Sequence, residues 1–514
     1  MSKAILLHGK DPVVRRLAQE IIVTQLQEIE VMRLRLAALQ TDSSSVPQKA
    51  RLESMSSTPV SNRDRVYTAD QTSNTVSVID PAENKLLGAI RLGDPVPGSL
   101  SPLYKGQLLV HGLGYSPDSK TLAVVSVGSN SITLIETANN KIKGVVYVGR
   151  SPHEAFFTPN GRELWVTVRG ENYVSVIDPV RMKEVRRIEL ANGPGMTMFG
   201  PDGKYAFVCS SFVPEIAIID AASHQIVKRL PQATPFSPNI AVTPENDEVW
   251  ITLKDAGKVQ VFSAKPPFAE KTLLDTGPIT NHVNFVNNRN GKFAYVTIGG
   301  ANELKVFRRG ETPELVATIP VGALPHGIWP SGDGSRVYVA LENGEHCIAI
   351  DTLTNKVTAN IPIGQTTQAL VYVPNAVPTG DGKENLMPLG VAANAARLQL
   401  EPSGNAPAEA RASVAVNSIG LLDLVQIAAK GLPPQTTYQV YLAESNHPPF
   451  GKLEPLAVLK TNPYGWSIVQ AIGPLKALAG DTPNSSPPKR FLLVTDMQDP
   501  SQVVLRQSDA SPAP

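Results

Sequence analysis

The sequence predicts a mainly β protein: a seven-bladed β-propeller followed by a small β-sandwich, with one amphipathic helix in front. Three observations support this prediction: a repeated unit, strand-like alternation of apolar and polar residues within it, and frequent turn residues between the strands. After a first interval of 56 residues, the spacing of the repeats holds between 42 and 45. The repeats align on an aromatic residue or its substitute, at Tyr67, Ala123, Trp165, Phe207, Trp250, Tyr295 and Tyr338.

Each repeat contains four short strands. In one copy ELWVTV is followed by YVSVID, which ends at Asp178, and apolar strands such as FFTPNG run into turns. Four strands in a unit of this length are typical of a propeller blade, and a ring of blades closes on itself, whereas a linear stack would leave exposed edges at both ends. The last copy ends with an extra strand, TQALVYVP, from Thr367 to Pro374. We expect this strand to lie innermost in the first blade, whose other strands begin near Arg65.

The propeller is predicted over residues 63–374, between two linkers. Residues 1–40 form the amphipathic helix, with apolar positions three and four residues apart, and such a helix must dock, self-associate or fray. Residues 41–62 are rich in Ser and Pro, and residues 375–392 in Pro, Gly and charge, which is typical of linkers.

Beyond the second linker, residues 393–508 contain short alternating runs separated by Gly, Pro and Asn. This pattern predicts the β-sandwich. The last residues, 509–514, are expected to be disordered.

The composition excludes several classes of function. The chain of 514 residues has 47 basic and 46 acidic residues, so no global field favours nucleic acid or an anionic membrane. No apolar run is long enough for a transmembrane helix, and two cysteines cannot build a disulfide framework. The first residues, MSKAILLHGKDP, contain no signal peptide, so a cytoplasmic location stays open.

The repeats resemble the YVTN-type seven-bladed β-propellers, whose units read YVTN, NxVxVID, VGxxP and SPDG. The resemblance covers residues 64 to 374 and implies the propeller fold and a periplasmic or other extracytoplasmic location. It does not select a function, because that superfamily includes surface proteins, binding proteins, lactonase-like hydrolases and metal or cofactor oxidoreductases.

The two flanking regions carry resemblances of their own. GKDPVVRRLAQEIIVTQLQEIEVM resembles the last helix of a family of small, often periplasmic four-helix bundles, some of them linked to copper handling. The paired-His motif of that family is missing here, so no metal role carries over and the helix is interpreted as a truncated bundle remnant. AAKGLPPQTTYQVYLAES resembles extracytoplasmic Ig-like sandwiches.

Histidines recur at one register of the repeats. The position just before or at the start of each inner strand is His in four of the seven copies, although the whole chain has only 8 histidines. Inner strands line the central channel of a propeller, so these residues are expected to ring one mouth of it. The candidate ligand-binding residues there are His111, His153, Asn239, His282, His326 and Gln368, joined by Arg169 and Glu342 from the ends of second strands.

Three interpretations of the histidines are open: turn residues that satisfy loop carbonyls, ligands of copper or zinc, or a general base. Adjacent pairs, His111 with His153 and His282 with His326, would each chelate across neighbouring blades. Lys254, at the end of another second strand, is also expected near the mouth, and Glu154 or Glu342 would act as a base.

We therefore predict a noncatalytic binding or scaffold protein that recognises a protein or a small ligand at the top face of the propeller. The alternative is a metal-dependent or lactonase-like enzyme that uses the four histidines at the channel mouth, with copper or zinc as the cofactor. No catalytic residue is assigned from the sequence. Nucleic acid is not an expected partner, and the N-terminal helix is the expected route to self-association.

Overall fold

The computed structural model describes residues 59–93, 108–389, 395–418, 423–473 and 490–509. The predicted N-terminal helix, most of the first linker and residues 510–514 lie outside these ranges. Within the described ranges no helix has the length and apolar character needed to cross a bilayer.

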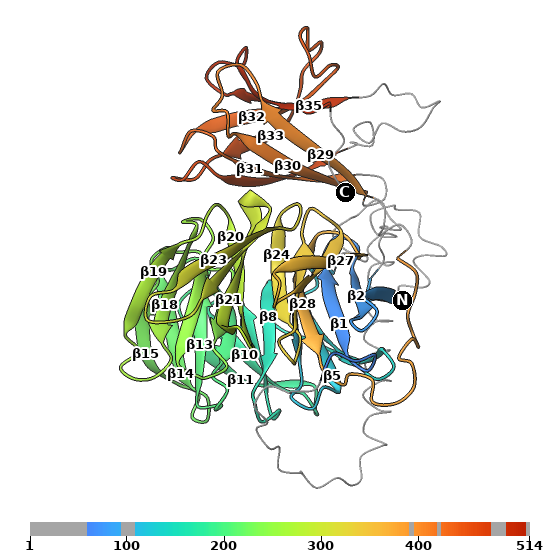
Figure 1. The fold of residues 1–514 in the computed structure, drawn as a ribbon, viewed down its shortest axis with the longest axis vertical. Coiled ribbons are helices and arrows are strands. Elements are labelled where there is room, and N and C mark those ends of the chain that lie inside the picture. The colour runs from blue at the N-terminus through green and yellow to red at the C-terminus, as the bar shows by residue number, and fades with distance from the viewer. Residues whose placement is uncertain (1–58, 94–107, 390–394, 419–422, 474–489, 510–514) are drawn as a thin grey trace, which may run out of the picture.

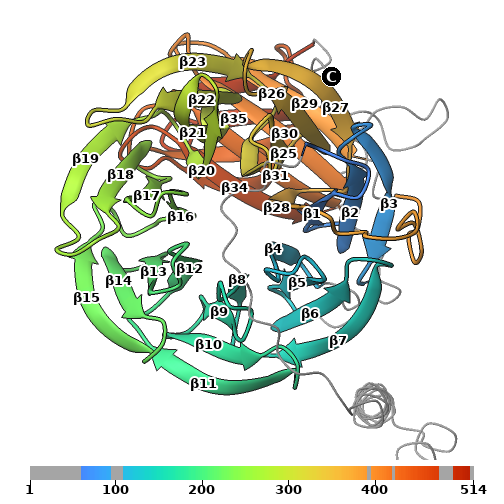
Figure 2. The same ribbon diagram turned by 60° about the horizontal axis from the view of Figure 1, so that its bottom comes forward.

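Seven four-stranded antiparallel sheets form a ring, which confirms the predicted propeller. Figure 2 shows the first strand of each blade nearest the central axis and the fourth at the rim. Blade 1 comprises β28 (Thr367–Val373), β1 (Arg65–Asp70), β2 (Thr75–Asp80) and β3 (Lys85–Arg91). Blade 2 comprises β4 (Val110–Tyr115), β5 (Thr121–Ser126), β6 (Ser131–Glu136) and β7 (Lys141–Tyr147). Blade 3 comprises β8 (Pro152–Phe157), β9 (Leu164–Val168), β10 (Tyr173–Asp178) and β11 (Lys183–Glu189).

The remaining blades follow the same order. Blade 4 comprises β12 (Pro194–Phe199), β13 (Tyr205–Ser210), β14 (Glu215–Asp220) and β15 (Gln225–Pro231). Blade 5 comprises β16 (Ile240–Val242), β17 (Glu248–Leu253), β18 (Lys258–Ser263) and β19 (Glu270–Asp275). Blade 6 comprises β20 (Thr280–Asn288), β21 (Gly291–Ile298), the 3-10 turn η1 (Gly299–Ala301), β22 (Glu303–Arg308) and β23 (Glu314–Pro320). Blade 7 comprises β24 (Pro325–Pro330), β25 (Arg336–Leu341), β26 (His346–Asp351) and β27 (Lys356–Pro362).

The ring closes in blade 1. Strand β28 pairs antiparallel with β1, with Val371 opposite Tyr67, so one strand from the end of the propeller completes a blade begun near its start. This is the closure that the extra strand of the last repeat predicts.

The core lies between neighbouring blades because each strand turns one apolar face toward the next sheet. The aromatic positions that define the repeat are at most 2% exposed, and Ala123 replaces the aromatic residue in blade 2. Acidic residues that end the third strands cap the following turns. Asp80 and Asp178, for example, each accept hydrogen bonds from backbone N–H groups two and three residues on.

The C-terminal region forms one sheet of eight strands rather than the two separate sheets of a sandwich. Its edge strands approach each other, so the sheet is nearly closed. We call residues 395–509 the C-terminal β-domain. In spatial order its strands are β33 (Glu454–Lys460), β32 (Thr437–Ala443), β35 (Phe491–Asp496), β36 (Val503–Gln507), β29 (Ala395–Pro402), β30 (Arg411–Ser418), β31 (Asp423–Lys430) and β34 (Ser467–Gly473).

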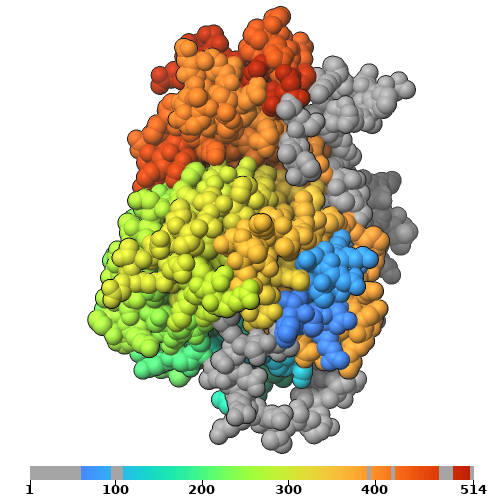
Figure 3. Space-filling model, viewed as in Figure 1, coloured from blue at the N-terminus to red at the C-terminus, as the bar shows by residue number. Residues whose placement is uncertain are grey.

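The C-terminal β-domain lies on one flat face of the propeller, with β30 and β31 toward the ring (Figures 1 and 3). We call this the covered face. Residues 375–389, part of the predicted second linker, pack on the propeller. Met387 forms a β-bridge with Ala89 of β3, and Asn140 donates a hydrogen bond to the carbonyl of Gly382.

Candidate functional site

The four register histidines lie at the starts of inner strands, on the covered face. All four side chains are buried, with residue exposures between 4% and 9%. They meet in two pairs, with ring centroids 4.3 Å apart for His111 and His153 and 4.6 Å apart for His282 and His326. We call this region the channel mouth.

Two of the rings are oriented by backbone carbonyls of the next blade. His153 Nδ1 lies 2.8 Å from the Gly195 carbonyl oxygen, and His326 Nδ1 lies 2.5 Å from that of Gln368. A carbonyl only accepts, so Nδ1 carries the proton and donates in both rings. In the neutral ring Nε2 then keeps its lone pair, which is the state that a metal ligand or a base requires.

Burial keeps these imidazoles neutral. Burial and the nearby Arg169 charge lower the pKa of His111 to about 3, and burial lowers the pKa of the other three rings well below the usual value. The His282 ring also contributes to the lowered pKa of His111, so the two pairs interact electrostatically. A neutral imidazole can bind a metal cation without first losing a proton.

A third donor joins the first pair. Glu154 follows His153 on β8, and ligand atoms of His111, His153 and Glu154 all lie within 4.8 Å of one another. Glu154 is 2% exposed, and burial raises its pKa to about 8. Its Oε2 atom and Nδ1 of His111 have no hydrogen-bond partner within the described part of the chain.

The glycine after His111 keeps this cluster compact. A Cβ atom on Gly112 would lie 2.5 Å from Glu154 Oε2 and 2.4 Å from the His153 carbonyl oxygen, closer than side chains are ever found. Neighbouring inner strands therefore approach here only because residue 112 has no side chain.

The second pair faces a different carboxylate. His326 Nε2 lies 3.9 Å from Glu342 Oε2, while Glu342 Oε1 accepts a 2.6 Å hydrogen bond from Gln426 Nε2 of the C-terminal β-domain. The channel mouth is thus completed in part by a side chain from outside the propeller, which the sequence did not reveal.

The other predicted residues take supporting positions. Asn239 Nδ2 donates to Met196 Sδ, 3.3 Å away, and its Oδ1 accepts from the Val283 N–H. The Gln368 side chain donates a hydrogen bond to the Thr366 carbonyl oxygen, and the Gln368 carbonyl oxygen accepts one from His326 Nδ1. Like His153 and His326, these two residues therefore have side chains that are hydrogen-bonded within the propeller.

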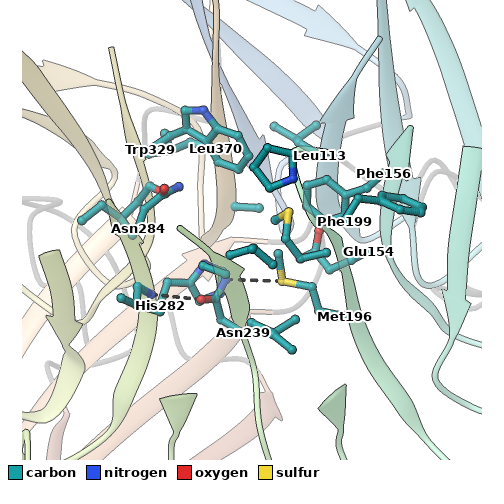
Figure 4. Close-up of a pocket in the computed structure, with 18 residues that line it drawn as sticks. Leu113, Glu154, Phe156, Met196, Phe199, Asn239, His282, Asn284, Trp329 and Leu370 are labelled. Carbon is teal, nitrogen blue, oxygen red and sulfur yellow. Dashed lines mark hydrogen bonds between the residues drawn. The ribbon is translucent and has the colours of Figure 1, made fainter. Parts of the chain in front are cut away.

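Below the mouth the channel holds a cavity of about 220 Å³ (Figure 4). Glu154, Asn239 and His282 contribute polar atoms to its wall. The rest is mostly apolar, from Leu113, Phe156, Met196, Phe199, Trp329 and Leu370 among others. A mostly apolar cavity beside a few convergent polar groups is the common form of a small-molecule site.

The C-terminal β-domain covers one side of the mouth. Asn417 donates to Thr366 Oγ1 at 2.8 Å, Arg397 forms an ion pair with Glu345 at 2.9 Å, and Asn462 Nδ2 donates to the Asp255 carbonyl oxygen at 3.0 Å. These contacts fall on the loops of blades 5, 7 and 1. Blades 2 and 3, which carry His111 and His153, make none of these hydrogen bonds.

Arg169 and Lys254 hold the same repeat position as Glu342, four residues after the aromatic position. The Arg169 guanidinium carbon lies 5.6 Å and 5.4 Å from the ring centroids of Phe212 and Phe236. Both cations lie close enough to the mouth to lower the pKa of His111. The aromatic pair was not foreseen, because the two rings come from loops with no repeat pattern.

Fold and site together define a seven-bladed propeller with a buried histidine and carboxylate cluster at its channel mouth. No family model matches the chain, and no curated protein matches it. Solved structures do. A protein of unknown function from Desulfotomaculum acetoxidans aligns with a TM-score of 0.50 and 13% identity, covering 60% of this chain and 98% of that one.

Two further structures fall just below that level of similarity. The periplasmic gluconolactonase of Pseudomonas aeruginosa gives a TM-score of 0.48 at 16% identity, covering 60% of this chain and 99% of the other. The hydrazine synthase of Kuenenia stuttgartiensis gives 0.47 at 18% identity, covering 55% and 94%. At such identities the similarity concerns the fold alone.

Proposed function

We propose that this protein is a binding protein whose channel mouth holds one zinc or copper ion on His111, His153 and Glu154. The observation that carries the proposal is the convergence of three buried donors within 4.8 Å, two of them neutral imidazoles. Two histidines and a carboxylate are a frequent ligand set for zinc, and imidazole also suits copper.

The surroundings fit a metal ion. The hydrogen bond from His153 Nδ1 to the Gly195 carbonyl is the outer partner that metal-bound histidines usually have. The Glu154 oxygen that lacks a partner would gain one, and this would offset the cost of burying the carboxylate. Three protein ligands leave a coordination position free for a small ligand.

A small ligand fits the mouth better than a protein partner. The C-terminal β-domain already lies over blades 5, 7 and 1, so a large surface cannot reach the channel from that side. The cavity of about 220 Å³ next to Glu154 offers space for part of a small molecule. We also propose an extracytoplasmic location, on the basis of the YVTN-type resemblance.

A metal-dependent or lactonase-like hydrolase is the second candidate function. The raised pKa of Glu154, about 8, favours it, because a carboxyl group that titrates near neutral pH suits general acid and base catalysis. A lactone hydrolysis assay on the zinc-loaded and copper-loaded protein tests this candidate. Turnover that falls in Glu154→Gln would favour the enzyme, and its absence with both metals would leave the binding function.

The binding function is tested by calorimetric titration of the chelator-treated protein with Zn²⁺ and with Cu²⁺. One of the metals should bind at one ion per chain, and His153→Ala should weaken binding about 100-fold or more, since even outer partners are worth roughly 10- to 100-fold. His282→Ala is the matched control, because His282 is equally buried at the same register but outside the three-donor cluster. Equal losses in both variants would contradict the assignment.

A further inference from the structure

A second cavity lies between the propeller and the C-terminal β-domain. This crevice, of about 330 Å³, is bounded on the propeller side by Phe236, Lys254, Asp255 and Ile279 and on the other side by Lys460 and Trp466, among others. Its volume is at the small end of the range for small-molecule sites. The crevice is separate from the channel cavity below the histidines, since the two share no lining residue.

Two half-buried cations at the crevice lack an ion pair or a hydrogen bond within the described ranges, while a third cation, Lys460 on the opposite side, is exposed. Lys254 lines it, and Arg169 stacks on Phe236, which also lines it. Neither cation has an ion pair or a hydrogen bond with any residue for which the structure gives a position. A guanidinium has five N–H donors and an ammonium three, so both leave binding capacity unused in a partly buried place.

The positive charges of Lys254 and Arg169 repel each other. Burial lowers the pKa of Lys254, and the Arg169 charge lowers it further. The carboxylates of Glu342 and Asp255 act in the opposite direction, but neither comes within ion-pair distance of Lys254. An anion beside Lys254 would relieve the repulsion between the two cations and receive charge-assisted hydrogen bonds.

The crevice also has apolar and aromatic walls, beside the polar side chains of Asp255, Lys460, Asn462 and Ser467. Phe236 and Ile279 face the crevice from the propeller, and Trp466 and Ile468 face it from the C-terminal β-domain. Phe212, the second ring beside Arg169, is 51% exposed. A bare inorganic anion would leave these surfaces in contact with water, whereas a ligand with an apolar body would cover them.

We propose that the crevice binds a small carboxylate with an apolar body. Lys254 and Arg169 pair with the carboxylate, and the rings of Phe236 and Trp466 contact the body. This site is independent of the metal proposed for His111, His153 and Glu154. Because its walls come from both domains, its ligand would also stabilise their contact.

The test is calorimetric titration of the full chain with phenylacetate and, separately, with its neutral analogue phenylacetamide. Phenylacetate should bind about tenfold or more tightly than phenylacetamide, because only the carboxylate pairs with the cations. Lys254→Met and Arg169→Met should each weaken phenylacetate binding about fivefold or more. Lys356→Met, on the exposed outer strand β27, is the matched control and should leave the affinity unchanged.

Three results would overturn the proposal. They are equal affinity for the acid and the amide, no phenylacetate binding at millimolar concentration, and equal effects of Lys254→Met and Lys356→Met. A circular dichroism spectrum of each variant checks that it is folded. Titration of His153→Ala separates the two sites: unchanged phenylacetate affinity supports the crevice, and lost affinity places the carboxylate on the metal instead.

Discussion

We predict that Asp70, the last residue of β1, makes ring closure depend on pH. Its carboxylate accepts hydrogen bonds from the hydroxyl groups of Thr68, Thr75, Ser77 and Thr367, at 2.6 to 3.1 Å. Thr367 belongs to β28, which reaches this blade from the far end of the propeller. Asp70 therefore links the two ends of the ring inside the protein.

The change we consider is Asp70→Asn. Burial raises the pKa of Asp70 from 3.8 to about 6, although the four hydroxyl groups lower it. At 1.36 kcal/mol per pKa unit, the ionised carboxylate reduces folding stability by about 3 kcal/mol relative to the protonated one. Because the pKa of Asp70 is higher in the folded than in the unfolded protein, the protonated carboxyl group stabilises the fold. This stabilisation is full below about pH 3.8 and is lost as the pH rises through about 6.

Urea denaturation followed by circular dichroism, at several pH values from 4 to 7, measures the effect. The stability of the wild type relative to Asp70→Asn should fall by about 2 kcal/mol across this interval, because only the carboxyl group titrates. Asp118→Asn, in an exposed turn, is the control and should show no such trend. Parallel pH profiles for the two proteins would refute the reasoning, and so would a wild type whose stability relative to Asp70→Asn rises with pH.

Two further changes probe the contacts between blades and between domains. Gly114→Ala should destabilise the propeller by roughly 3 kcal/mol, measured by thermal and urea unfolding. The reason is that a Cβ atom on residue 114 would lie 2.0 Å from the Ala155 carbonyl oxygen. Gly310→Ala is the control and should have little effect, because a Cβ atom there would have no close neighbour. Gln426→Leu should weaken the attachment of the C-terminal β-domain by about 1 to 3 kcal/mol, because Glu342 Oε1 loses its donor. Limited proteolysis between the domains should then be faster, and an unchanged rate would contradict the contact.

The propeller was predictable because its signal is repeated. An aromatic position every 43 residues or so, with alternation around it, places each strand in the same part of each blade. The repeat places His111, His153, His282 and His326 at one position, at the starts of inner strands. It places Arg169, Lys254 and Glu342 at another, four residues after the aromatic position. Repetition converts a weak local preference into a strong prediction.

The covering of the mouth could not be predicted in this way. Gln426, Asn417 and Arg397 contact the propeller from strands that have no repeat to align with it, so only the docked structure brings them to Glu342, Thr366 and Glu345. The Phe212 and Phe236 pair is hidden for a similar reason, since two loops of different blades meet only in three dimensions.

The most direct test is elemental analysis by mass spectrometry of the protein purified without a chelator or a His-tag. We expect close to one zinc or copper ion per chain in the wild type and none in the folded His111→Ala, His153→Ala double variant. Equal metal content in both proteins, or a wild type that stays empty even after incubation with both metals, would contradict a metal ion at the channel mouth.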